Sequence, residues 1–216
     1  MADALRQRQI EPALLLAVTA TALVLSGIAP YDRLTWAMEV SWVAVALPVL
    51  VATRRSFPLT PLLYRLLCLH ALILIVGGYY TYARVPLGFW AADLFGFTRN
   101  HYDRLGHLAQ GFIPAILARE ILVRRSPLAG SRWLPVVVVS LCLAFSAFFE
   151  LIEWTSALVL GADAAAYLAT QGDPWDTQAD MLCALLGASA ALALLSRLHD
   201  RQLGKLLEGR APVGAC

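Results

Sequence analysis

The chain has 216 residues, of which 59% are hydrophobic and only 15% are charged, whereas about a quarter of the residues in a soluble domain are charged. The mean hydropathy of +0.66 and the arrangement of the apolar residues in long blocks exclude an ordinary soluble domain. The net charge of +2 comes with no basic stripe interleaved with aromatic residues, so nucleic-acid binding has no support.

Each apolar block approaches the roughly 20 residues that a helix needs to cross a bilayer. Helices are favoured because they satisfy their own backbone hydrogen bonds in lipid. The sequence therefore predicts an all-α, polytopic transmembrane helical bundle that forms one membrane domain over residues 1–216. About six spans are expected, followed by a charged cytoplasmic tail. The spans are residues 12–29, 34–52, 62–83, 102–123, 134–160 and 174–196, and the tail is residues 197–216.

Lysine and arginine are distributed unequally between the two ends of the predicted bundle. Of the 17 such residues, only Arg33, Arg84, Arg99 and Arg104 lie at the end opposite the termini. The positive-inside rule places the basic end in the cytoplasm, so both termini are expected there. An odd number of spans would mix the two groups of residues. The number of spans and the orientation thus support each other.

Three of the predicted spans carry ionisable residues in pairs, three or four positions apart, which places each pair on one face of its helix. The pairs are Asp103 with His107, Glu150 with Glu153, and Asp176 with Asp180.

The depths of these pairs along their spans can be compared from the helical rise. His107 and Asp180 lie about 6 Å beyond Asp103 and Asp176, at the start of spans that begin outside. Glu150 lies about 25 Å along a span that begins inside. The three pairs are therefore expected at a similar depth near the outer face. A charged residue at the centre of a span costs about 2.5–3.5 kcal/mol, so these side chains should face the bundle interior.

Other polar and small residues have structural interpretations. Asp173 and Asn100 suit the N-caps of the helices that follow them. Glu39 is a lone acid near a span end and is interpreted as structural or as snorkelling to the interface. The spacing of Ala184 and Ala188 is typical of close helix packing in membranes.

The six paired residues permit several kinds of chemistry. Carboxylates with a histidine suit a divalent cation such as Mg, Mn, Zn or Fe, so all six are candidate ligands of a divalent metal ion. They also suit metal-free acid–base catalysis or movement of protons or cations. Glu150, Glu153 and His107 are the candidate catalytic residues.

Several strings around these residues carry a resemblance to a known family. FTRNHYDRLGHLAQGFIPA, FFELIEW, GDPWDTQADM and the later SRLHDRQL resemble the YjdF-type family of bacterial inner-membrane proteins over roughly residues 62–203. The resemblance implies a helical, multi-pass protein of the inner membrane. That family is a domain of unknown function, so the resemblance implies no reaction.

A more distant resemblance is to the VanZ-like family, which is associated with glycopeptide resistance. Its pattern opens a span with Asp-Lys-x-x-His and continues with Glu-x-x-Gln and Asp-x-x-x-Asn. The corresponding elements here begin at Asp103, Glu150 and Asp176. Glu153 and Asp180 replace the Gln and Asn, so this site is more acidic than the pattern.

Three functional hypotheses remain open on the sequence alone. The first is a membrane-embedded enzyme or envelope factor that acts on a lipid or cell-wall precursor, with a divalent metal as its cofactor. The second is an ion-coupled transporter, although the inner halves of the spans are nearly free of ionisable residues. The third is a structural or partner-binding membrane protein whose polar residues tie its helices together. The lipid bilayer is the expected partner in all three, and the oligomeric state stays open.

Overall fold

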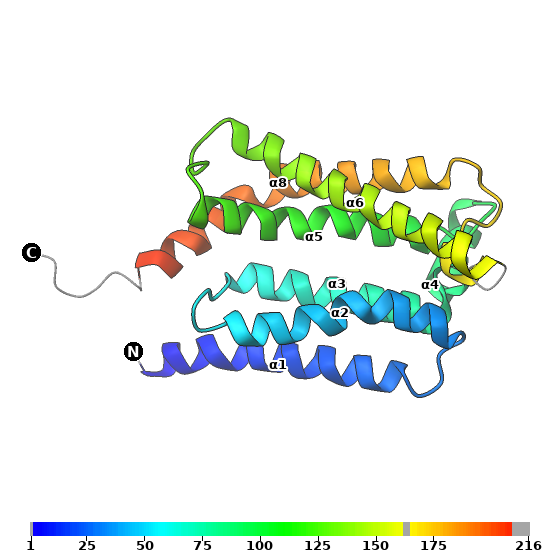
Figure 1. Ribbon diagram of the computed structural model, residues 1–216. Coiled ribbons are helices and arrows are strands. Elements are labelled where there is room, and N and C mark those ends of the chain that lie inside the picture. The colour runs from blue at the N-terminus through cyan, green and yellow to red at the C-terminus, as the bar shows by residue number, and fades with distance from the viewer. Residues whose placement is uncertain (1, 162–164, 209–216) are drawn as a thin grey trace, which may run out of the picture.

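The computed structural model describes residues 2–161 and 165–208, and every regular element in these ranges is a helix. Six long helices lie along one another (Figure 1). They are α1 (Ala2–Ser26), α2 (Arg33–Thr53), α3 (Pro61–Tyr80), α5 (Tyr102–Arg125), α6 (Trp133–Leu160) and α8 (Asp176–Glu208). The shorter elements are the 3-10 turn η1 (Tyr82–Arg84), α4 (Pro86–Phe95) and α7 (Ala165–Leu168). The predicted all-α class is confirmed.

The last long helix differs from its predicted span. The charged tail expected from residue 197 is helical as far as Glu208, and residues 209–216 lie outside the described part of the chain. The helix continues because one face of this segment still packs on the bundle, where His199 and Leu203 are buried. A charged sequence was interpreted as a tail although it also has the spacing of an amphipathic helix.

Among the described residues, four helices are long and apolar enough to cross a membrane, namely α2, α3, α6 and α8. The apolar part of α1 is shorter and covers Ile10–Ser26, and α5 carries charged residues near both of its ends. Six crossings and cytoplasmic termini therefore stay predictions. The start of α1 and the end of α8 lie at the same end of the bundle (Figure 1), as an even number of crossings requires.

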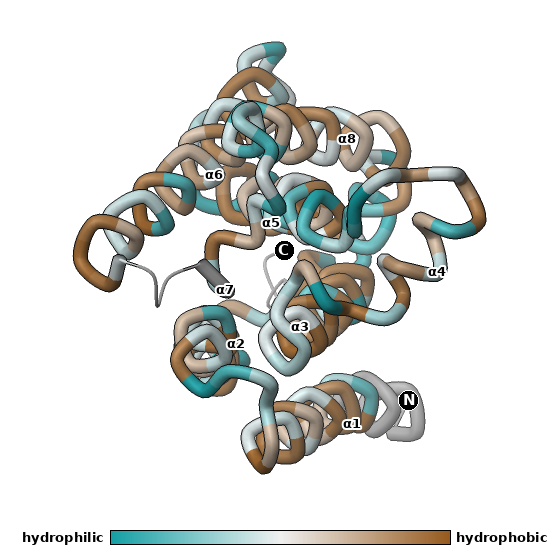
Figure 2. Tube along the Cα trace, turned by 90° about the vertical axis from the view of Figure 1, so that its right-hand side faces the viewer, coloured by the Kyte–Doolittle hydropathy of each residue, from teal (hydrophilic) through white to brown (hydrophobic). Residues whose placement is uncertain are grey.

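The long helices form two groups, with α1, α2 and α3 on one side and α5, α6 and α8 on the other (Figure 2). Helix α3 joins the groups because it packs on α1, α2 and α5, and α5 packs most extensively on α8. Large apolar side chains point outward, such as Val159 at 77% and Leu194 at 71% exposed. Acidic residues such as Asp103 and Glu120 are instead buried. This distribution is the one expected of a bundle in lipid.

Small residues let α5 and α8 approach closely. A Cβ atom added to Gly111 of α5 would overlap the carbonyl oxygen of Ala184, and one added to Gly187 of α8 would overlap that of Leu108. Ala184 and Ala188 are completely buried, in agreement with the packing expected from their spacing. Close backbone approach is a general basis of helix association in membranes.

We expect Gly111→Ala to lower the free energy of unfolding by about 1–3 kcal/mol, the usual cost of overpacking, because the methyl group would push α8 away from α5. Gly204→Ala is the matched control, since a Cβ there meets nothing within 4 Å. Titration of the detergent-solubilised protein with sodium dodecyl sulfate measures the free energy of unfolding of both variants. Equal stability of the two variants would contradict the packing argument.

Candidate functional site

Polar side chains gather at both ends of α5. The group near its start, here called the acidic cluster, has contributions from α2, η1, α5, α6 and α8. Its buried members are Glu39, Tyr82, Asp103, His107, Glu150, Glu153, Asp176 and Asp180. The group near the end of α5, here called the Glu120 cluster, consists of Thr60, Arg119, Glu120, Arg124 and His199.

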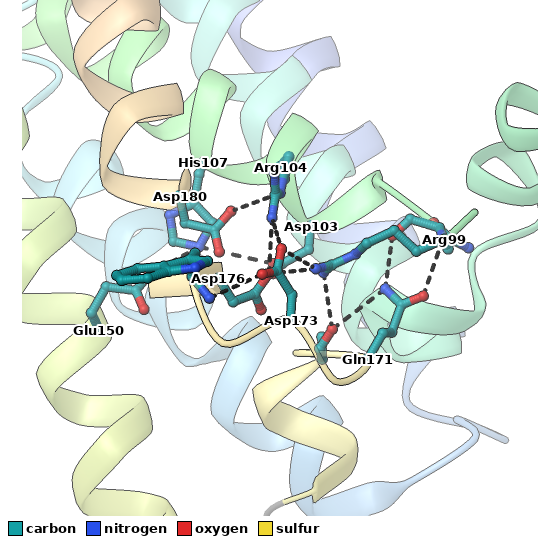
Figure 3. A network of polar contacts seen from close by, with 12 residues as sticks. Arg99, Asp103, Arg104, His107, Glu150, Gln171, Asp173, Asp176 and Asp180 are labelled. Carbon is teal, nitrogen blue, oxygen red and sulfur yellow. Dashed lines mark hydrogen bonds and ion pairs between the residues drawn. The ribbon is translucent and has the colours of Figure 1, made fainter. Parts of the chain in front are cut away.

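Two arginines bind two aspartates at the rim of the acidic cluster (Figure 3). Arg99 lies 3.0 Å from Asp173 and 2.8 Å from Asp176, while Arg104 lies 2.6 Å from Asp173 and 3.3 Å from Asp176. We call this four-residue network the arginine latch. It compensates the charge of Asp176, which the sequence had suggested as a metal ligand.

The latch fastens the start of α5 and the residues just before it to the start of α8 and the residues just before that helix. Next to it, the backbone N–H of Asn100 donates to Gln171 Oε1 at 3.1 Å, and Gln171 Nε2 donates to the backbone carbonyl of Asn100 at 2.8 Å.

Neither N-cap candidate occupies an N-cap position, because His101 directly precedes α5 and α8 begins three residues after Asp173. Both side chains instead accept local hydrogen bonds in the connections before these helices. Asn100 Oδ1 accepts from the amide of Tyr102 at 3.0 Å, and Asp173 Oδ1 accepts from that of Trp175 at 2.9 Å.

Asp103, His107 and Asp180 meet behind the latch. Each is buried, and each offers one potential ligand atom within 4.8 Å of the others. His107 Nε2 is 3.9 Å from Asp103 Oδ1 and 3.5 Å from Glu150 Oε1. Asp180 Oδ1 and Glu150 Oε1 are buried without a hydrogen-bond partner among the described residues. The similar depth calculated for the three pairs is therefore matched by their convergence.

Glu39 belongs to this site, contrary to its interpretation as a lone structural or snorkelling acid. Its side chain is only 3% exposed and lies beside the Tyr82 hydroxyl, with Asp103 near enough to act on its charge. The Tyr82 ring fits against Gly77 and Gly106, where a Cβ would collide with it. Depth could have identified Glu39, because it lies about 9 Å along its helix from the start of α2, at the same end of the bundle as Asp103.

Sequence reasoning also missed the Glu120 cluster. Glu120 and His199 are completely buried, and Glu120 Oε2 lies 3.0 Å from His199 Nε2. Thr60 Oγ1 donates to the same carboxylate at 2.9 Å, and Arg124 donates to its other oxygen at 2.7 Å. Arg119 in turn lies 2.7 Å from His199 Nδ1. This cluster ties the start of α3 to α5 and α8.

We expect Glu120→Ala to lower the free energy of unfolding by about 3–5 kcal/mol, because removing one partner of a buried ion pair leaves the other charge uncompensated. Glu11→Ala is the control, since Glu11 pairs with Arg65 on an exposed surface and such pairs contribute about 1 kcal/mol or less. Denaturant titration in detergent compares them. A loss no greater for Glu120→Ala than for Glu11→Ala would be inconsistent with a structural role of the cluster.

The rim of the site should respond to pH through Asp173. The amide of Trp175, assisted by the guanidinium of Arg104, holds the pKa of Asp173 below its usual value, which is about 3.9. A lowered folded-state pKa stabilises the fold above the usual value, and this stabilisation disappears as pH falls through the lowered pKa. Asp173→Asn should therefore lower the thermal midpoint at neutral pH and much less in strong acid. A difference in thermal midpoint between the parent and Asp173→Asn that stays constant with pH would refute this role of Asp173.

A cavity of about 1220 Å³ runs beside α5. Glu39, Asp103 and His107 line it at the acidic cluster, and Arg54 and Lys205 line it at the opposite end. Its remaining walls are mainly apolar side chains of α1, α2, α3, α5 and α6. The acidic cluster is thus accessible from a space large enough for part of a lipid-sized molecule.

Comparison with known proteins agrees with the helical membrane architecture. Residues 11–201 match the family described as "Predicted membrane protein (DUF2238)". The chain is 53% identical over 181 residues to the "Inner membrane protein YjdF" of Escherichia coli (strain K12), an alignment that covers 84% of this chain and 87% of the relative. No solved structure matches. The YjdF-type resemblance is confirmed, whereas nothing in these matches supports the VanZ-like one.

Proposed function

The chain belongs to the DUF2238 family of predicted membrane proteins and is a multi-pass protein of the bacterial inner membrane, and we propose that it acts on the head group of an envelope lipid through a divalent-metal centre. The centre consists of Asp103, His107 and Asp180. The observation that carries this proposal is the convergence of one ligand atom from each residue within 4.8 Å, in a buried position. Two carboxylates and an imidazole suit Zn, Mn or Fe.

Charge balance supports a cation at this centre. The arginine latch is directed at Asp173 and Asp176, and its closest approach to Asp180 is 4.0 Å, from Arg104 Nε. Asp103, Asp180 and Glu150 are thus left together around one histidine. Carboxylates this close repel one another unless they take up protons or share a cation. The unpartnered Oδ1 of Asp180 leaves an oxygen available as a ligand.

Glu150 and Glu153 have different positions beside the centre. Glu150 Oε1 is 3.5 Å from His107 Nε2, and its carboxylate lies beside the Thr177 side chain. A metal ion held there would polarise a phosphate or carbonyl oxygen of the head group. Glu150 would accept the proton of a water molecule that attacks this ester, and would return it to the oxygen released when the ester bond breaks. Glu153 lies one helical turn further along α6 and is buried, so we assign it to a supporting role.

The two other hypotheses have less support. A transporter needs polar groups along its path, but the cavity wall between the acidic cluster and Arg54 is mainly apolar. A purely structural role suits the Glu120 cluster and the arginine latch, whose charged groups are paired. It does not account for the buried oxygens of Asp180 and Glu150 that lack a hydrogen-bond partner among the described residues. The predicted topology, with six crossings and cytoplasmic termini, would place the metal centre near the outer face.

Metal analysis of the purified protein tests the proposal. We expect about one divalent ion per chain in the parent, and its loss in Asp180→Asn, because that variant removes one of three ligands. Asp176→Asn is the matched control. It removes an acid of the same helix that the latch already compensates, so it should keep the ion even if stability falls.

Glu150→Gln separates metal binding from chemistry. It should keep the metal but lose the envelope phenotype that the parent restores in a deletion strain. A parent without stoichiometric metal, or equal metal in the parent and both aspartate variants, would overturn the metal centre. Full complementation by Glu150→Gln would overturn the catalytic role of Glu150.

A further inference from the structure

The half of the cavity furthest from the acidic cluster has a length that matches a lipid chain. Trp42 and Arg54 both line the cavity from α2, and their separation along the helix corresponds to about 18 Å. The hydrocarbon core of a bilayer is about 30 Å thick, so the chains of one leaflet span about 15 Å. Apolar side chains line the cavity between these two residues. They include Val43, Leu47, Leu50, Leu67, Ala71 and Leu117.

Helices α2 and α6 meet at the cavity through aromatic side chains. Within the described residues, α2 packs chiefly on α3. It reaches α6 through Trp42, whose ring centroid lies 5.3 Å from that of Phe145 and 6.4 Å from that of Phe149. All three aromatic residues line the cavity, and the ring centroid of Phe149 lies 5.7 Å from that of His107 in the acidic cluster. A hydrocarbon chain that ends at these rings would occupy the apolar part of the cavity beside α2.

The mouth at the far end of this space is positively charged. Arg54, where α2 ends, and Lys205 of α8 line it, together with Arg55. Glu11 lines the same end, but its carboxylate is paired with Arg65. Basic groups next to a membrane attract anionic lipid head groups, and a phosphate oxygen is a strong acceptor for an arginine or lysine donor.

We propose that this half of the cavity binds one acyl chain of an anionic phospholipid, with the lipid phosphate at Arg54 and Lys205. The length of the apolar part of the cavity matches an acyl chain, and the basic residues at its mouth favour an anionic head group. The site is separate from the metal centre and does not depend on it.

Native mass spectrometry of the full-length protein in detergent tests this, with phosphatidylglycerol and phosphatidylcholine of identical chains as probes. We expect the parent to bind phosphatidylglycerol at least about tenfold more tightly than phosphatidylcholine. The reason is that each basic residue near an anionic group raises the affinity several-fold. The double variant Arg54→Gln/Lys205→Gln should lose this preference. Leu47→Trp, which fills the chain path, should weaken retention of both lipids while the thermal midpoint confirms folding.

Two control variants make the outcome specific. Arg132→Gln removes a basic residue that does not line the cavity, and it should keep the preference. Asp180→Asn should keep it as well, so failure of the metal centre and failure of the lipid site can be distinguished. Equal retention of the two lipids by the parent, or an equal loss in Arg132→Gln and in the double variant, would overturn the proposal.

Discussion

Helix α5 carries ionisable residues at both of its ends, and it can lie within a bilayer only if other helices surround it. The close packing against α8 meets this requirement, and it depends on Gly111 and Gly187, where a Cβ would overlap the facing backbone. Helices α3 and α6 cover other parts of the α5 surface. The positions of the acidic cluster, the Glu120 cluster and the cavity all follow from this central helix.

The two ends of α5 resolve the cost of burying charge in different ways. At one end, Glu120 accepts hydrogen bonds from Thr60 and Arg124 and lies against His199, so its charge is compensated within the protein. At the other end, the arginine latch pairs Asp173 and Asp176, but Asp180 Oδ1 and Glu150 Oε1 are buried without hydrogen-bond partners among the described residues. Complete pairing stabilises a fold, whereas incomplete pairing leaves oxygen ligands free for a cation. This contrast distinguishes the structural cluster from the candidate functional one.

The sequence predicted the helices and much of the acidic cluster because both depend on regular spacing. Block length indicated the helices, and pairs on one helix face indicated Asp103 with His107 and Asp176 with Asp180. Glu39 and His199 were missed because each is a single polar residue whose partners come from other helices. The spacing of residues within one helix does not reveal a partner that lies on another helix. The latch was missed for the same reason, since its residues lie at the starts of two helices far apart in the chain.

The dependence of α5 on α8 also has a consequence for how the protein is made. Helices enter the membrane in the order of synthesis, and α5 emerges before the helix on which it packs most extensively. Until α8 has been inserted, the α5 face that carries Asp103 and Gly111 lacks its main neighbour. The free-energy cost of exposing those polar groups to lipid persists during this interval. A chain whose translation stops before α8 would therefore expose a polar helix to lipid, the kind of defect that membrane proteases and chaperones remove.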